Sequence, residues 1–337
     1  MPDWGSPISS LERLDFKVTR WQGARLPRDT SPVHGNIFLA PGIDSQLAHQ
    51  LLDTPARRVI AEGRRGRLEE VCHDGTSYAR KVYRVTKKSI HGTAVSWMPA
   101  FMRWGRGRRS WKAMLEGKKR AMPLPRVLCR SENRRQARLV TTWIPGEPLH
   151  HWHARQLQQS NDDSWQRSFA EWIGPQLYQL FDAGMTTRDL SPNNVLITGP
   201  TAGPWQFHLV DLDEARLQRF TDGESFIDQV IYSLSQVGHL PSTISPRVKL
   251  RALIAFLEAG GQRWADGQAE FSPRSTSFFD RRAARKKFMR QVIDGVLRFD
   301  RRKEKHLKKA GRTGRYAGWG LDDDGLPVPF DGARDET

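Results

Sequence analysis

The sequence predicts an α+β protein with two lobes, the first rich in strands and the second in helices. From about residue 57 to residue 84 the sequence has the pattern of short strands, and Asp74-Gly75 is a favourable hairpin turn. A Pro-Gly pair then breaks the chain near residue 145, and apolar residues recur at helical spacing from residue 164 onward. A cleft between two such lobes is a common place for a ligand.

In the first lobe, the segments RRVIAEG and GRLEEVCHDG predict two strands around a glycine-containing turn, and TSYARKVYRV predicts a third. Residues 103–120 are very basic and have a helical pattern in their second half. The stretch PLPRVLCRSENRRQARLVTTW, which begins at residue 123, predicts two further strands joined by a polar turn.

In the second lobe, SWQRSFAEWIGPQLYQLFDAG places its large apolar side chains near one face of a helix, and Gly184 fits its C-cap. The polar stretch TTRDLSPNN follows and leads into the apolar strand VLIT at residues 195–198. GPTAGPWQ then predicts the turn of a hairpin whose second strand ends near Asp211. Residues 225–260 are predicted to be helical.

These elements divide the 337 residues into four parts. Residues 1–55 form an N-terminal extension to which no role is assigned. Residues 56–145 form the first lobe and residues 146–273 the second. Residues 274–337 form a basic helix and tail.

The composition is that of a soluble globular protein, with 38% hydrophobic residues and a mean hydropathy of −0.63. No stretch approaches the roughly 20 apolar residues of a membrane-spanning helix, and the N-terminus lacks the pattern of a secretory signal. The two cysteines, Cys72 and Cys129, have the spacing of neither a zinc site nor a disulfide framework. We therefore expect a cytoplasmic protein.

The net charge of +17 predicts an anionic partner. Nucleic acid, an anionic membrane face and a phosphorylated glycolipid all fit this charge. Residues 274–316 hold sixteen Lys/Arg against four Asp/Glu. The segment lacks interleaved aromatic stacking platforms of the kind that single-strand binders use, which disfavours nucleic acid.

Within this basic segment, Phe288, Val292, Val296 and Phe299 recur at helical spacing and predict an amphipathic basic helix. Two interpretations stay open. The helix could pack on the second lobe with its cations outward, or it could lie on an anionic membrane face.

The polar stretch before residue 195 carries candidate chemistry. Asp189 precedes Asn194 by five residues in a turn that contains Pro192. The carboxylate could accept a proton from an attacking hydroxyl, and the amide oxygen could bind Mg²⁺, which prefers oxygen ligands. Asp211 lies seventeen residues further on and could bind the same metal. The alternative is an ordinary Asx-rich turn, but the presence of Lys81 and Asp211 in the required order favours a phosphoryl-transfer site.

Several motifs together resemble the lipopolysaccharide core kinase family (Kdo/heptose kinase type) of the protein-kinase-like fold. RDLSPNNVLI resembles the catalytic loop of that fold, and VDLD resembles its metal-binding segment. The narrower resemblance, which covers roughly residues 57–260, rests on Lys81-Val82-Tyr83, Trp111 through Pro125, Ile144-Pro145-Gly146-Glu147, Gly184 through Leu190, and Asp211 through Arg216.

The resemblance implies a strand-rich N-lobe, a helical C-lobe, and ATP and Mg²⁺ as cofactors. It implies that Asp189 positions or deprotonates the acceptor hydroxyl and that Arg188 braces the loop. The residues implied in binding are Lys81 for the ATP phosphates, Glu116 for orienting that lysine, the backbone of Thr142, Trp143 and Ile144 for adenine, and Asn194 and Asp211 for Mg²⁺.

The sequence departs from the kinase pattern at three places. Thr187 stands where the catalytic loop usually has histidine, and Asp213 stands where protein kinases have glycine. The helix position that usually supplies the lysine's glutamate falls on Ser110, so that Glu116 is the nearest acid. Asp213 is expected to form a salt bridge rather than to bind metal.

The expected function is ATP-dependent transfer of a phosphoryl group to a hydroxyl on a lipopolysaccharide core sugar or similar glycolipid, with the protein peripheral at the inner membrane. One alternative keeps the fold and changes the acceptor, as in a protein Ser/Thr kinase or a small-molecule kinase. Another is a pseudokinase or anion-binding scaffold. The acceptor hydroxyl and the oligomeric state stay open.

Overall fold

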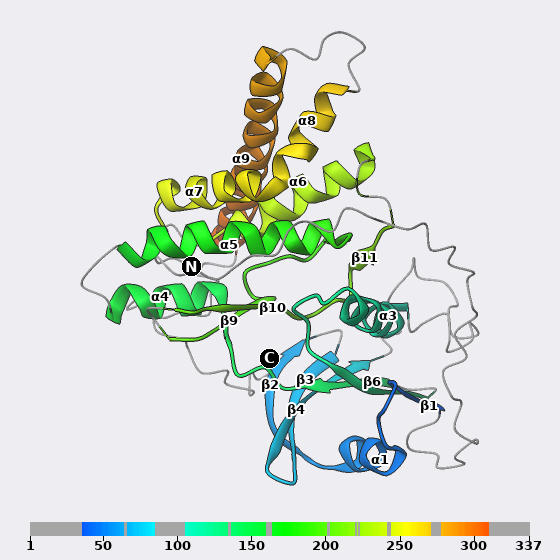
Figure 1. Ribbon diagram of the computed structural model, residues 1–337. Coiled ribbons are helices and arrows are strands. Elements are labelled where there is room, and N and C mark those ends of the chain that lie inside the picture. The colour runs from blue at the N-terminus through cyan, green and yellow to red at the C-terminus, as the bar shows by residue number, and fades with distance from the viewer. Residues whose placement is uncertain are drawn as a thin grey trace.

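The computed structural model describes residues 36–63, 66–84, 105–133, 136–159, 164–200, 203–219, 221, 223–240, 244–270 and 278–309. Within these residues the protein has the predicted α+β architecture, with a sheet on one side and a group of helices on the other (Figure 1). The arginines of the turn between Gly63 and Gly66, the first 35 residues and the tail after residue 309 lie outside the described residues.

The N-lobe is built on a six-stranded antiparallel sheet with the order β1-β5-β6-β4-β3-β2. Its strands are β1 (Asn36–Leu39), β2 (Ala56–Gly63), β3 (Gly66–His73), β4 (Thr76–Arg84), β5 (Val127–Glu132) and β6 (Gln136–Thr142). Helix α1 (Ser45–Asp53) packs Leu51 and Leu52 against this sheet. Since β1 and α1 belong to the sheet and its cover, the N-lobe begins before residue 56, earlier than the sequence indicated.

The predicted hairpin at Asp74-Gly75 joins β3 and β4. Both turn residues have positive φ, 47° and 73°, as two-residue hairpin turns require. The hairpin fixes the register in which Lys81 of β4 pairs with Leu68 on one side and Leu139 on the other. Lys81 therefore lies in a central strand rather than at an edge.

Helix α3 (Gly105–Lys119) packs between the sheet and β11 (Ala215–Leu217) (Figure 1). Its buried side chains include Trp111 and Met114, and Ser110 beside them is also buried. The helix therefore brings an almost wholly buried hydroxyl to the region where the two lobes meet.

The C-lobe holds helices α4 (Leu149–Gln159), α5 (Ser164–Asp182), α6 (Glu224–Gly238), α7 (Pro246–Phe256), a π-helical turn η2 (Leu257–Gly261) and α8 (Gln262–Glu270). Two small antiparallel sheets lie between these helices and the N-lobe. They have the orders β10-β9-β7 and β11-β8, built from β7 (Glu147–Pro148), β8 (Met185–Thr187), β9 (Val195–Thr198) and β10 (Gln206–Leu209).

Helix α9 (Phe278–Lys309) packs against α6 and α8 (Figure 1). Phe288 and Val292 are buried in the main core, and Phe299 contacts the ring of Tyr232. The basic helix therefore contributes to the C-lobe core, as the packing interpretation predicted. Within the described residues, no helix combines the length and apolar character needed to cross a bilayer.

Candidate active site

The loop between β8 and β9 carries Asp189 and Asn194. The segment that leads through β8 into this loop begins after Gly184, which ends helix α5 with φ of +84° and donates its N–H to Phe181 O (2.8 Å). A Cβ at Gly184 would lie 2.3 Å from Gln218 O, so only glycine allows this close approach. β8 then pairs with β11, which places the loop beside the segment that contains Asp211.

Thr187, in the place of the usual histidine, braces this loop. It is 4% exposed, and its Oγ1 accepts the backbone N–H of Asp189 (3.1 Å). Its carbonyl accepts the hydroxyl of Ser233 (2.8 Å), while the N–H of Leu190 donates to Gln236 Oε1 (2.9 Å). Helix α6 therefore holds the backbone on both sides of Asp189, which orients the carboxylate in advance.

Asn194 closes the loop. Its Nδ2 donates to the carbonyl of Asp189 (2.9 Å), which leaves Oδ1 as the acceptor that faces away from this bond. Its own carbonyl accepts from Val210 N (2.9 Å), next to Asp211. Among the described residues the carboxylate of Asp189 makes no hydrogen bond or ion pair, so it is free to accept a proton from a ligand.

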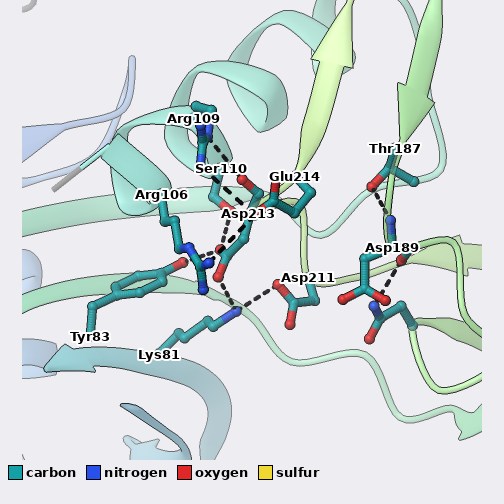
Figure 2. A network of polar contacts seen from close by, with 11 residues as sticks. Lys81, Tyr83, Arg106, Arg109, Ser110, Thr187, Asp189, Asp211, Asp213 and Glu214 are labelled. Carbon is teal, nitrogen blue, oxygen red and sulfur yellow. Dashed lines mark hydrogen bonds and ion pairs between the residues drawn. The ribbon is translucent and has the colours of Figure 1, made fainter. Parts of the chain in front are cut away.

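Asp211 follows β10 in a left-handed backbone conformation with φ of 56°, which is uncommon outside glycine and typical of functional positions. This conformation aims its carboxylate at the N-lobe, where Lys81 Nζ donates to Oδ1 (2.6 Å). Figure 2 shows Asp211 between Lys81 and Asp189. Three predicted site residues from distant parts of the chain therefore meet here.

Asp213 is the second acid at the lysine (Figure 2). Lys81 Nζ donates to its Oδ2 (2.8 Å), and Oδ1 accepts from Tyr83 (2.7 Å) and Ser110 (2.9 Å). Arg109 Nε donates to its carbonyl (3.0 Å). Asp213 therefore forms the salt bridge expected of it, and the partner is Lys81 itself.

Burial and neighbouring charges set the protonation of this group. Burial alone would lower the pKa of Lys81, but Asp211 and Asp213 outweigh it, and the pKa lies above its ordinary value. Burial raises the pKa of Asp211 and, against the effect of Lys81, keeps it above its usual range. Burial would also raise the pKa of Asp213, but Lys81 and two hydroxyl donors lower it. Of these two carboxylates, Asp211 is thus the one whose ionised form a further cation would stabilise more.

The structure does not bring Glu116 to Lys81, contrary to the sequence-based expectation. Its carboxylate pairs with Lys119 (3.0 Å) and Arg120 (3.9 Å) on and just after α3. Glu116 lies six residues after Ser110, so it lies on another side of the helix from the residue that reaches Asp213. The acid that holds the lysine comes from the segment after β10 instead.

Arg188 is also placed differently from the expectation. Its side chain is exposed and makes no hydrogen bond or ion pair within the described residues; the bonds that brace the loop come from Thr187 and α6. The guanidinium lines a surface pocket instead.

Thr142, Trp143 and Ile144 lead from the last strand of the large sheet to β7 and thus connect the two lobes. Thr142 N donates to Arg126 O (2.9 Å), and Ile144 O accepts from Gly146 N (2.8 Å). Arg58 of β2 lies over the ring of Trp143, with 5.9 Å between the guanidinium carbon and the ring centroid. This linker is therefore within reach of β2 on the N-lobe side.

The oxygen atoms around Asp211 fit Mg²⁺. No group of three or more His, Cys, Asp or Glu side chains that could hold a metal occurs among the described residues. Mg²⁺, however, is commonly held by one or two protein oxygens together with water and substrate phosphate. Asn194 Oδ1 and the Asp211 oxygen that Lys81 leaves unbonded provide such a pair.

The sequence assigned no role to two residues that contact Asp213. Tyr83 and Ser110 both donate to its carboxylate. Tyr83 was noted only as part of the Lys81-Val82-Tyr83 motif, where it lies on the same face of the strand as Lys81. Ser110 was noted only as the position where an acid was absent.

Two comparisons with known proteins found matches. The model of the lipopolysaccharide kinase (Kdo/WaaP) family matches residues 51–227. A solved structure described as WaaP in complex with acyl carrier protein resembles the chain with a TM-score of 0.50 and 15% sequence identity, over 76% of this chain and 91% of that one. At this identity the likeness shows the fold, which is protein-kinase-like. A search of curated proteins found no match.

Proposed function

The chain belongs to the lipopolysaccharide kinase (Kdo/WaaP) family, and we propose that it transfers the γ-phosphoryl group of ATP to a hydroxyl on a lipopolysaccharide core sugar or similar glycolipid. The observation that carries this proposal is the convergence of Lys81, Asp189, Asn194 and Asp211 from three separate segments of the chain. Such a set supplies positioning and charge neutralisation, which are what phosphoryl transfer requires.

Asp189 accepts the proton of the acceptor hydroxyl in this proposal. Its carboxylate has no partner among the described residues, and hydrogen bonds to its backbone N–H and carbonyl hold it in place. Because the loop is braced before any ligand binds, little reorganisation is needed when the hydroxyl arrives.

Lys81 binds the phosphates of ATP, and the backbone of Thr142, Trp143 and Ile144 meets the adenine at the linker between the lobes. Asn194 and Asp211 would hold Mg²⁺, which when bound neutralises charge on the phosphate oxygens. The raised pKa of Asp211 supports this role, because a nearby cation would favour its ionised form.

A phosphotransfer assay with labelled ATP tests the proposal. The full chain is incubated with Mg²⁺ and, in parallel, with a lipopolysaccharide glycolipid, a free sugar and a generic protein. We expect label in the glycolipid. Label on the protein alone would identify a protein kinase, and label on none of the three would favour a pseudokinase.

Replacing Asp213 by Asn is expected to raise the KM for ATP about 10-fold or more, because one charged hydrogen bond that orients Lys81 is lost. Glu116→Gln is the matched control and should leave the KM unchanged, since its carboxylate contacts only Lys119 and Arg120 within the described residues. Steady-state kinetics with ATP as the varied substrate measure both. A rise in the KM in the Glu116 variant alone would show that the lysine depends on the helix acid after all.

We also propose that the outer face of α9 lies against an anionic membrane at the cytoplasmic side of the inner membrane. Ile293 and Leu297 are 43% and 44% exposed, although both are large and apolar. They follow Arg290 at helical spacing and precede Arg301, and both arginines are exposed. An apolar centre flanked by cations is the pattern of a helix that rests on anionic lipid.

Arg290→Glu is expected to weaken binding to anionic vesicles about 30-fold, because each cation near such a surface contributes about 1 kcal/mol and the change reverses one. Arg247→Glu on α7 makes the same charge change at another exposed site and is the control. Sedimentation with phosphatidylglycerol and with phosphatidylcholine vesicles measures the effect. Point changes are needed because Phe288 and Val292 belong to the core, so that deletion of α9 would disturb the fold. Equal binding of both variants would refute the membrane role of α9.

A further inference from the structure

A pocket of about 410 Å³ lies beside the catalytic loop. Its walls come from the end of β8, from β11 and from the first turns of α6. Thr187 and Arg188, the two residues that precede Asp189, both line it. The pocket therefore adjoins the backbone that leads into Asp189, the residue proposed to receive the proton of the acceptor hydroxyl. None of its lining residues is a hydrogen-bond partner of Lys81.

Two arginines dominate the charge of this pocket. Arg188 and Arg216 both line it, both are exposed, and neither makes an ion pair or hydrogen bond through its side chain within the described residues. Of the two acids in the lining, Glu214 lies 3.6 Å from Arg106 and 3.9 Å from Arg109 of α3, so its charge is already compensated. Asp228 is the other acid. Its single negative charge does not balance the two arginines, so the pocket keeps an excess of positive charge.

The remaining lining fits a saccharide. Tyr232 presents a ring that is 41% exposed, and an exposed aromatic ring has an apolar face and a polar end. Gln229 of α6 lies beside it and is held by hydrogen bonds with Thr186 (2.9 Å) and Ser225 O (2.9 Å). A fixed amide, an aromatic ring and two guanidinium groups together offer both polar and apolar contacts to a charged sugar.

We propose that this pocket binds the acidic group, carboxylate or phosphate, of the acceptor saccharide, and that Arg188 and Arg216 determine specificity for it. Planar guanidinium groups bind both kinds of oxyanion through paired hydrogen bonds. The assignment rests on the proposed function, because it makes the pocket part of the acceptor site. An acid held here fixes the sugar so that a neighbouring hydroxyl faces Asp189.

Arg216 is the residue to change, because it lies on β11, outside the catalytic loop. Arg216→Gln keeps hydrogen-bonding capacity and removes the charge. Arg247→Gln on α7 removes the same charge from another exposed position and is the control. Binding to the full chain is measured by titration calorimetry with three probes: a free sugar acid, a sugar phosphate and a neutral sugar. Phosphotransfer is measured with a glycolipid that carries the acid and with the same glycolipid after reduction of its carboxylate to an alcohol.

We expect Arg216→Gln to weaken binding of the acidic probe about 10- to 100-fold, the value of one charged hydrogen-bonding group, and to leave the KM for ATP unchanged. The stronger of the two acidic probes identifies the group as carboxylate or phosphate. Equal binding of acidic and neutral sugars, or equal binding by the variant and its control, would overturn the inference. A wild-type protein that binds acidic sugar but transfers no label would instead refute the proposed function and leave the binding site standing.

Discussion

Replacing Asp189 by Asn is expected to lower kcat about 10²- to 10⁴-fold while the KM for ATP changes little. The range is what a positioned general base typically contributes. Asparagine keeps the shape of the side chain but cannot accept a proton from the hydroxyl. The fold should be unaffected, because the loop uses only the backbone N–H and carbonyl of this residue. Single-turnover rates with labelled ATP and the glycolipid acceptor measure the change.

Glu258→Gln, at an exposed position in η2, is the control for loss of one carboxylate. Its kcat should equal that of the wild type. Thermal unfolding of both variants checks that neither is destabilised. If the Asp189 variant is folded and keeps its kcat, the proton is accepted elsewhere and the assignment of the loop is wrong.

The Asp211→Asn change is expected to lower kcat/KM about 10³-fold and to raise the Mg²⁺ concentration needed for half-maximal activity. A metal ligand and its charge are lost together, and metal-ion stabilisation of a phosphoryl-transfer transition state is worth several kcal/mol. Lys81 should stay in place, because Asp213 still accepts from it (2.8 Å). Titration of Mg²⁺ at saturating ATP separates the metal effect from the nucleotide effect.

Asp213→Asn is the comparison for this experiment, because it removes the other carboxylate at Lys81. It should alter the KM for ATP and leave the Mg²⁺ requirement near that of the wild type. The reverse result, with Mg²⁺ dependence lost in the Asp213 variant and kept in the Asp211 variant, would exchange the two roles.

Local patterns predicted the fold and the course of the chain before β9 well. The hairpin at Asp74-Gly75, the end of α5 at Gly184 and the hairpin between β9 and β10 all occur where short-range chemistry placed them. Each depends on residues close together in the sequence, where turn propensity and apolar periodicity decide the structure.

The partner of Lys81 could not be predicted in the same way. The lysine and Asp213 are 132 positions apart, and their contact depends on how β4, α3 and the segment after β10 pack together. The resemblance implied an acid on the helix, and Glu116 is the nearest acid there in the sequence. Packing instead presents Ser110, whose hydroxyl is too short to pair with the lysine but well placed to hold Asp213.

The sequence predicted one face of the basic helix α9 and not the other. Phe288 and Val292 were expected on an apolar face, and they are buried against the C-lobe. Periodicity alone could not show that Ile293 and Leu297 would stay uncovered, because this depends on which neighbours reach the other side of the helix. One helix thus contributes to the core and keeps a mixed apolar and basic face outside.

We propose that this chain phosphorylates a core sugar of a glycolipid by means of Asp189. The most direct test is to locate the transferred group: the glycolipid product is cleaved between saccharide and lipid, and each part is analysed by mass spectrometry. We expect one added phosphoryl group on a core sugar with the wild type and none with Asp189→Asn. A phosphoryl group on the lipid part, or equal phosphorylation by the two proteins, would contradict it.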